Sequence, residues 1–296
     1  MIPILNASGC LDALAAPEVA RSLDAFVTKT VTPLPREGNV PVRIVETERG
    51  MLNSIGLANP GIDSFLADAL PRLRSLARPL WVSVGGFCAS DYVHLCERLD
   101  SCEDVSTIEL NLSCPNVEEA PESAAEIVLA CREATGKPLY AKLSPALPDV
   151  ASVAVAVQTA GADGLSLVNT CRGLALDPAT LQPVLATATG GYSGPALKPL
   201  ALAAVYACYR ATQLPIVGMG GITTGADALE FIAAGARAVA LGTVLFSDPD
   251  APARVRLELE AEAERVGGAG LDDAFAAAHQ RDPTVHTLDS HFRVGV

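Results

Sequence analysis

The chain has 296 residues, 50% of them hydrophobic, so it can bury a large core. Its formal net charge is −13 at pH 7, and its Lys and Arg residues are spread along the chain. We therefore expect neither nucleic acid nor an anionic membrane as a partner, because both require a basic surface. We also expect a cytoplasmic protein, because the sequence contains neither a signal-peptide pattern nor an apolar stretch long enough to span a membrane.

Eight short runs rich in Val, Ile and Leu predict eight β-strands, at residues 4–9, 26–32, 80–86, 106–114, 138–144, 164–170, 215–222 and 238–245. Helical patterns lie between most of them, for example at residues 16–25, 123–134, 151–161, 195–211 and 224–235. The last of these helices has Thr224 as its expected N-cap and Gly235 just past its end. Repeated strand–helix alternation with eight strands is typical of a (β/α)₈ TIM barrel, which we expect as a single domain over residues 1–296. A doubly wound sheet is the alternative.

Residues 33–61 interrupt this alternation between the second and third strands. The segment is rich in Pro and Gly, and the alternation in residues 41–47 predicts a small hairpin. An insertion that follows a barrel strand lies on the catalytic face. We therefore expect a small insertion after the second strand, over the face that carries the active site.

Polar side chains stand near the ends of several predicted strands, although a barrel interior is otherwise aliphatic. Glu109 and Asn111 alternate with apolar neighbours on the fourth strand, and Lys29, Lys142 and Asn169 stand near the ends of three others. An unpaired buried ammonium is costly, so two lysines at the same end of a barrel predict an anionic or electron-rich ligand.

The last two strand–helix units carry a second signal. Gly220 and Gly221 lie between the seventh strand and a helix, and Gly242 and Thr243 follow the eighth strand. Glycine allows backbone N–H groups to approach a phosphate, and the N-terminus of the helix adds partial positive charge. These two loops are the usual phosphate site of a barrel, so we expect a phosphate-bearing ligand there.

The eight cysteines include no Cys-x-x-Cys pair and no cluster with His at zinc spacing. We expect no metal site and no disulfide framework, and we interpret most of the cysteines as small buried apolar residues. Cys114 is the exception that needs another explanation, because it follows a strand and stands between Asn111 and Asn116.

Several stretches, taken in order, resemble the class 1 dihydroorotate dehydrogenases over nearly the whole chain. They are NASG, TKTVTPLPREGN, ETERGMLNSIGLANPG, IELNLSCPNV, AKLSP, VNT, GGYSGPALKPLAL and GMGGITTGADALEFIAAGARAVALGT. NLSCPN and GMLNSIGLANPG are the most diagnostic. The resemblance implies a flavin enzyme of pyrimidine (UMP) synthesis that oxidises dihydroorotate to orotate.

The resemblance also implies which residues form the site. The residues expected around FMN are Ala7, Ser8, Gly9, Lys29, Asn111, Lys142, Gly194, Gly220, Gly221, Gly242 and Thr243. Those expected around the pyrimidine are Asn53, Ile55, Gly56, Leu57, Asn111, Asn116, Asn169 and Thr170. Cys114 would act as the base that takes the C5 proton while flavin N5 takes the C6 hydride. Lys142 would stabilise the charge at flavin N1, with Lys29 near the ring and the substrate.

The electron acceptor stays open at this stage. Membrane-bound relatives use Ser as the base, so Cys114 argues against quinone. Residues 116–128, however, lack the stretches that we associate with either soluble subfamily, and the region between Val117 and Ala124 is short. With NAD as the electron acceptor, the protein would require a separate FAD/iron–sulfur subunit. With fumarate as the acceptor, it would not. We expect a homodimer in either case. Two other functions remain as alternatives: another FMN-dependent barrel oxidoreductase acting on a dihydropyrimidine, and a Schiff-base aldolase using Lys142.

Overall fold

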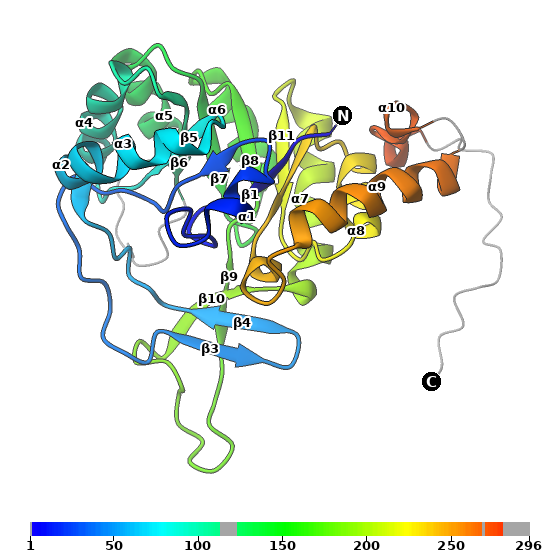
Figure 1. The fold of residues 1–296 in the computed structure, drawn as a ribbon, viewed down its shortest axis with the longest axis horizontal. Coiled ribbons are helices and arrows are strands. Elements are labelled where there is room, and N and C mark those ends of the chain that lie inside the picture. Colours follow the sequence, from blue (N-terminus) through cyan, green and yellow to red (C-terminus); the bar gives the residue numbers. More distant parts are fainter. Residues whose placement is uncertain (1, 113–122, 268–269, 281–296) are drawn as a thin grey trace.

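A computed structural model describes residues 2–112, 123–267 and 270–280. Within these residues, eight parallel strands form one sheet in the order β1–β12–β11–β8–β7–β6–β5–β2, and a bridge between Leu5 and Ala25 brings the first and last strands together. The strands are β1 (Ile4–Asn6), β2 (Phe26–Val27), β5 (Leu80–Val84), β6 (Val105–Asn111), β7 (Leu139–Leu143), β8 (Gly164–Leu167), β11 (Ile216–Met219) and β12 (Ala238–Leu241). The predicted (β/α)₈ barrel is confirmed (Figure 1).

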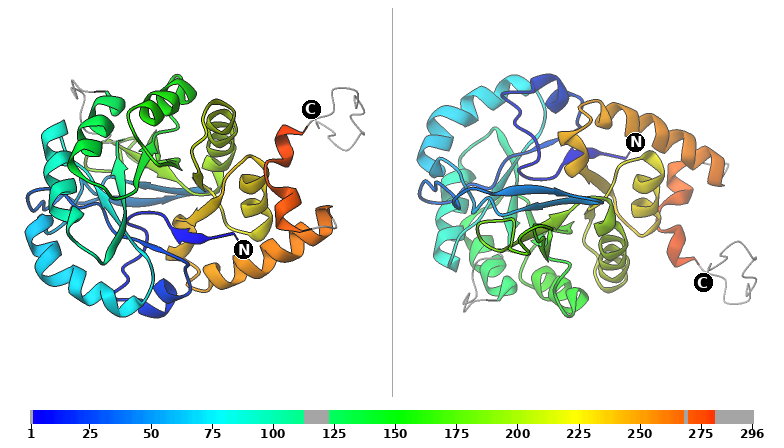
Figure 2. Two further views of the ribbon diagram at one scale, coloured as in Figure 1. Left: turned by 90° about the horizontal axis from the view of Figure 1, so that it is seen from above. Right: turned by 90° about the horizontal axis from the view of Figure 1, so that it is seen from below.

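Helices surround the strands, as the two end-on views in Figure 2 show. The α-helices are α1 (Pro17–Arg21), α2 (Gly61–Ser64), α3 (Leu70–Leu73), α4 (Ala89–Asp100), α5 (Ala124–Ala134), α6 (Val150–Thr159), α7 (Lys198–Ala211), α8 (Gly225–Ala233), α9 (Ala251–Gly267) and α10 (Leu271–Ala274). A π-helical turn, η1 (Phe65–Ala69), lies between α2 and α3, and short 3₁₀ turns are η2 (Arg74–Leu76), η3 (Pro195–Leu197), η4 (Thr243–Phe246) and η5 (Ala277–His279). The caps predicted for α8 are confirmed. Thr224 accepts a hydrogen bond from the Asp227 backbone, and Gly235 has a φ of +110° just past the end of the helix.

The barrel strands are shorter than the sequence pattern predicts. The second strand, expected at residues 26–32, is only Phe26–Val27, with one further bridge from Val31 to Val84. Lys29 and Asn169 therefore lie in the loops that leave the carboxyl ends of β2 and β8, whereas Asn111 and Lys142 stay within their strands.

A second sheet of four antiparallel strands stands at one end of the barrel (Figure 1). Its order is β3 (Ile44–Thr47), β4 (Gly50–Asn53), β10 (Thr189–Ser193) and β9 (Cys171–Leu174). The hairpin expected after the second barrel strand is confirmed as β3–β4. The sequence analysis missed its partner hairpin, β9–β10, which is inserted between β8 and α7 and completes the sheet.

Aliphatic side chains form the core, as the composition indicates. The larger cluster lies between the barrel and its helices, and a smaller one fills the barrel interior with Leu5, Val27, Val217, Met219 and Ala240 among its members. Within the described part of the chain, no helix is long and apolar enough to cross a membrane. The seven described cysteines are all unpaired.

Candidate active site

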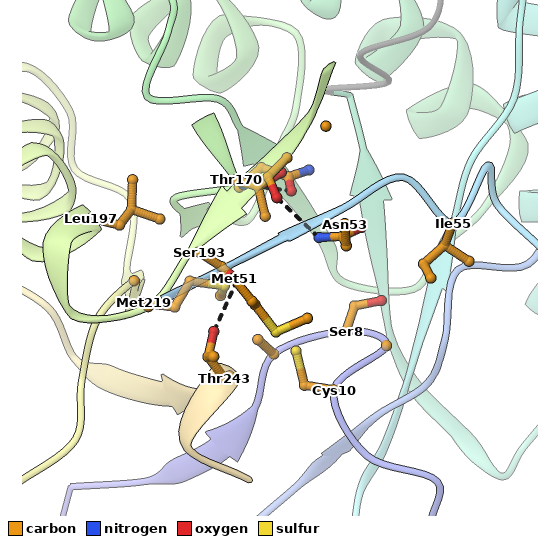
Figure 3. A pocket seen from close by; sticks show the side chains of 18 of the residues that line it. Ser8, Cys10, Met51, Asn53, Ile55, Thr170, Ser193, Leu197, Met219 and Thr243 are labelled. Atoms are coloured by element: carbon orange, nitrogen blue, oxygen red, sulfur yellow. Dashed lines mark hydrogen bonds between the residues drawn. The ribbon is translucent and has the colours of Figure 1, made fainter. Parts of the chain in front are cut away.

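A cavity of about 590 Å³ lies between the barrel and the small sheet, within the usual size range of small-molecule sites. Every predicted site residue that the structure describes lines it: Ala7, Ser8, Gly9, Lys29, Asn53, Ile55, Gly56, Leu57, Asn111, Lys142, Asn169, Thr170, Gly194, Gly220, Gly221, Gly242 and Thr243. Figure 3 shows Asn53 from the small sheet opposite Ser8 and Cys10 from the loop after β1. Cys114 and Asn116 lie outside the described residues.

The two lysines approach the cavity from different strands. Lys142 is the penultimate residue of β7, and its side chain is 7% exposed, with Nζ 3.4 Å from Oε1 of Glu109 on β6. Lys29 follows β2 and lies against the backbone of Gly9, where an added Cβ would come 3.0 Å from Lys29 Cδ. Gly9 has a φ of +78°, so a side chain there would be strained as well as crowded. The glycine therefore permits the approach of Lys29.

The asparagines form a hydrogen-bonded row. Asn169 donates from Nδ2 to Oδ1 of Asn111 over 2.9 Å, and Asn111 donates from Nδ2 to Thr30 Oγ1 over 3.3 Å. Asn169 also accepts from the backbone N–H of Thr170 over 2.8 Å. Across the cavity, Asn53 donates to the carbonyl of Gly191 over 3.3 Å (Figure 3). These bonds fix the directions in which the amide groups present donors and acceptors to a ligand.

Glycine backbones shape the end of the cavity nearest α8. Gly220 and Gly221 have φ values of +123° and +81°, which other residues rarely adopt. A Cβ at Gly242 would instead meet no crowding, with Ala7 Cβ at 3.6 Å and Cys10 Sγ at 3.7 Å. Since all three of these residues line the cavity, that Cβ would occupy ligand space. Beside it, Thr243 donates to Ser193 Oγ over 2.9 Å (Figure 3).

Sequence reasoning missed several lining residues, among them Cys10, Thr30, Met51, Arg172 and Ser193. Arg172 and Ser193 belong to the hairpin β9–β10, which the sequence analysis did not predict. Cys10 directly follows the NASG stretch, which was the available signal. Burial raises the pKa of its thiol above the ordinary value, while the charges of Lys142 and Lys29 oppose that rise.

Comparison with known proteins agrees with this geometry. A family model described as dihydroorotate dehydrogenase matches residues 1–262. The chain belongs to the dihydroorotate dehydrogenase family. A relative from Pelobacter propionicus is 45% identical over 287 residues, which are 93% of this chain and 94% of the relative. One from Latilactobacillus sakei is 46% identical over 261 residues, or 83% of this chain and 84% of the relative. Both are named dihydroorotate dehydrogenase B (NAD(+)), catalytic subunit.

A solved structure supports the same assignment. The crystal structure of DHODH from Eimeria tenella in complex with ferulenol has a TM-score of 0.78 and 25% identity, over 94% of this chain and 86% of that chain. The family predicted from the motifs is confirmed, and the protein is an oxidoreductase of the dihydroorotate dehydrogenase family. The Schiff-base aldolase alternative is set aside, as is the doubly wound sheet.

The residues that line the cavity fit a flavin group. Glycine stands at Gly220, Gly221 and Gly242, where side chains would be strained or would fill ligand space, and two cationic side chains stand beside a neutral amide row. The described residues hold no group of three or more His, Cys, Asp or Glu side chains that could bind a metal ion.

Proposed function

We propose that the protein oxidises dihydroorotate to orotate with bound FMN, in the synthesis of pyrimidine nucleotides. The observation that carries the proposal is the convergence of two lysines and three asparagines on one cavity at the carboxyl ends of the barrel strands. Their positions in the sequence range from Lys29 to Asn169, so the fold alone brings them together.

The residues expected around FMN divide by chemistry. Gly220, Gly221, Gly242 and Thr243 would hold its phosphate with backbone and hydroxyl donors, while Ala7, Ser8, Gly9 and Gly194 would line the ring and the ribityl chain. Lys142 would lie beside the pyrimidine edge of the ring, and its charge would favour electron density there. Bound FMN would supply a hydride acceptor at N5.

The substrate would be held by groups that match its amide-like ring. Asn53, Asn111, Asn169 and Thr170 offer both donors and acceptors, as Asn116 would. The turn from Ile55 to Leu57 would present backbone N–H groups to the carboxylate, and Gly56 has the φ of +73° that this turn requires. Two faces of the cavity would thereby fix one orientation of the ring.

Cys114 would take the proton from C5. A thiol is a good base near neutral pH only if its surroundings favour the thiolate, and two cationic lysines at the site would do so. Cys114 lies outside the described residues, so its role rests on its place in the NLSCPN stretch.

Electrons from the reduced flavin would pass to a separate partner subunit. The relatives are named as NAD(+)-dependent catalytic subunits, and this supports NAD as the final acceptor through a separate subunit, for which we propose FAD and an iron–sulfur cluster. We also propose that the chain forms a homodimer. The cytoplasmic location expected from the sequence stays a prediction.

Anaerobic titration of the purified protein tests the proposal. After reconstitution with FMN, added dihydroorotate should bleach the visible absorption of the flavin and yield an equal amount of orotate. A protein that takes up no FMN, or whose flavin is not bleached, would refute the proposal. Fumarate turnover without a partner would contradict the acceptor alone.

A further inference from the structure

Glu109 is a buried carboxylate that the proposed reaction leaves without a task. It is 1% exposed and lies in the middle of β6, with its side chain toward the barrel interior, where Oε1 is 3.4 Å from Nζ of Lys142. Lys142 lines the cavity, whereas Glu109 does not. The carboxylate thus touches the cavity only through the lysine.

The strand register explains this arrangement. Asn111 of β6 is paired with Lys142 of β7, and Glu109 is paired with Tyr140 one layer deeper. Asn111 and Lys142 therefore form the layer that faces the ligand, and Glu109 stands directly beneath that layer. A long lysine side chain on β7 can meet the ligand above and the carboxylate below.

Burial makes the pair energetically significant. A charge at a site this inaccessible is tolerated only when an opposite charge or several hydrogen bonds compensate it. Without the carboxylate beneath it, the Lys142 ammonium would lose this ion pair and would no longer be held in the same place. Its positive charge would then be less well positioned at the floor of the cavity.

We propose that Glu109 is a positioning residue that holds the Lys142 ammonium in place at the floor of the cavity, and that it thereby sets the preference of the site for reduced over oxidised FMN. The inference rests on the proposed FMN site. Glu109 acts through Lys142, because the lysine carries a full charge in the layer that faces the ligand while the carboxylate is one layer deeper.

The test measures the dissociation constants of oxidised and reduced FMN for the wild type and for Glu109→Gln, which keeps the size of the side chain and one acceptor oxygen. In Glu109→Gln, the preference for reduced over oxidised FMN, given by the ratio of the two dissociation constants, should fall about tenfold. This fall corresponds to a decrease of about 30 mV in the reduction potential of the bound flavin, for a two-electron couple. Glu103→Gln is the matched control, since it removes the same charge from an exposed position and should leave the ratio within about twofold.

A second pair of variants shows whether the effect passes through the lysine. In a Lys142→Met background, Glu109→Gln should leave the ratio of the two FMN dissociation constants unchanged, because that background has no Lys142 ammonium for Glu109 to position. The double variant buries no unpaired charge, so it should fold even if Glu109→Gln alone does not.

Each outcome decides the matter. An unchanged or increased preference for reduced FMN in Glu109→Gln would overturn the inference, and so would an effect that persists in the Lys142→Met background. Either result, with wild-type FMN binding intact, would leave the proposed function standing. A wild-type chain that binds no FMN would overturn both.

Discussion

The side-chain amide of Asn169 donates to the side-chain oxygen of Asn111 over 2.9 Å, although the two residues are 58 positions apart in the chain. Asn111 stands at the end of β6 and Asn169 just beyond β8, so β7 lies between them in the sheet. Asn111 in turn donates to Thr30, and the oxygen of Asn169 accepts from the Thr170 backbone. The row therefore acts as one unit, and loss of one member should disturb its neighbours.

Asn169→Ala should weaken orotate binding about tenfold to a hundredfold, because it removes a ligand group and leaves the oxygen of Asn111 with an unpaired lone pair in a partly buried site. FMN affinity should change much less. Fluorescence titration of the oxidised protein with orotate measures the first effect. Gln213→Ala, at an exposed position after α7, is the control and should bind orotate as the wild type does. Equal orotate affinity in the two variants would remove Asn169 from the site.

Lys142→Ala should weaken FMN binding and slow reduction by dihydroorotate by orders of magnitude, because the charge at the pyrimidine edge of the ring is lost. It should also lower the free energy of unfolding by about 3–5 kcal/mol, since Glu109 then remains buried without its ion pair. The double variant Lys142→Met, Glu109→Gln should regain most of that stability but not the reduction rate. Urea denaturation and stopped-flow bleaching measure the two effects separately. A single variant with wild-type reduction kinetics would contradict the role of the lysine.

The loss of stability expected for Lys142→Ala depends on an ion pair that the sequence alone did not predict. The positions of Glu109 and Lys142 on neighbouring predicted strands were evident from the sequence, but their contact depends on the register between β6 and β7. Register is set by the packing of the whole barrel, and a change of one residue would turn Glu109 away from the interior. The sequence therefore predicted the lysine at the site without its ion pair.

The hairpin β9–β10 was missed for a different reason. Residues Thr189–Ser193 include two glycines and have weak strand propensity, so no local pattern marked them. They form a strand because they pair with β4. This pairing depends on the tertiary fold and leaves no local signal in the sequence. The barrel strands, in contrast, have strong local patterns, and Lys29, Asn111, Lys142 and Asn169, expected near their ends, line the cavity.

Gly242→Ala should lower FMN affinity about tenfold without destabilising the fold. The nearest atom to a new Cβ at Gly242 is 3.6 Å away, so the substitution introduces no clash. The methyl group would instead compete with the ligand for space in the cavity. Gly136→Ala is the matched control, because a Cβ there meets nothing within 4 Å. Differential scanning fluorimetry without FMN should show both variants within about 2 °C of the wild type. Unchanged FMN affinity in Gly242→Ala would contradict the placement of the phosphate.

Asp227 should make the stability of the protein sensitive to acid. Burial alone would raise the pKa of this carboxyl, but hydrogen bonds from Lys198, Thr223 and Thr224 outweigh it and lower the pKa to about 2. A depressed pKa in the folded state stabilises the protein at pH values above the unfolded-state pKa, and this contribution is lost as the pH falls through about 4 toward 2. Asp227→Asn should therefore cost about 2 kcal/mol at pH 7 and less at pH 3. Urea unfolding at the two pH values measures the difference, and an equal loss at both would contradict the linkage.

Cys114→Ser tests the base. Orotate should still bind, because the asparagines and backbone N–H groups that contact the ring are unchanged, and dithionite should still reduce the flavin. Reduction by dihydroorotate should become very slow near neutral pH, because a serine hydroxyl is far less ionised there than a thiol, whose reference pKa is about 8.5. The rate should rise with pH, as expected for a base that must first lose its own proton.

Cys10 supplies the strongest competitor for the same role, since it is a thiol that lines the cavity. Burial raises the pKa of Cys10, which keeps its thiol protonated near neutral pH and makes it a poor base. Single-turnover reduction across a pH series should therefore separate Cys114→Ser from Cys10→Ser, with a far larger loss and a steeper pH dependence in the first. Cys102→Ser, at the end of α4, is the control and should match the wild type. If Cys114→Ser stayed within about threefold of the wild type throughout while Cys10→Ser lost the reaction, the proton would go to Cys10 instead.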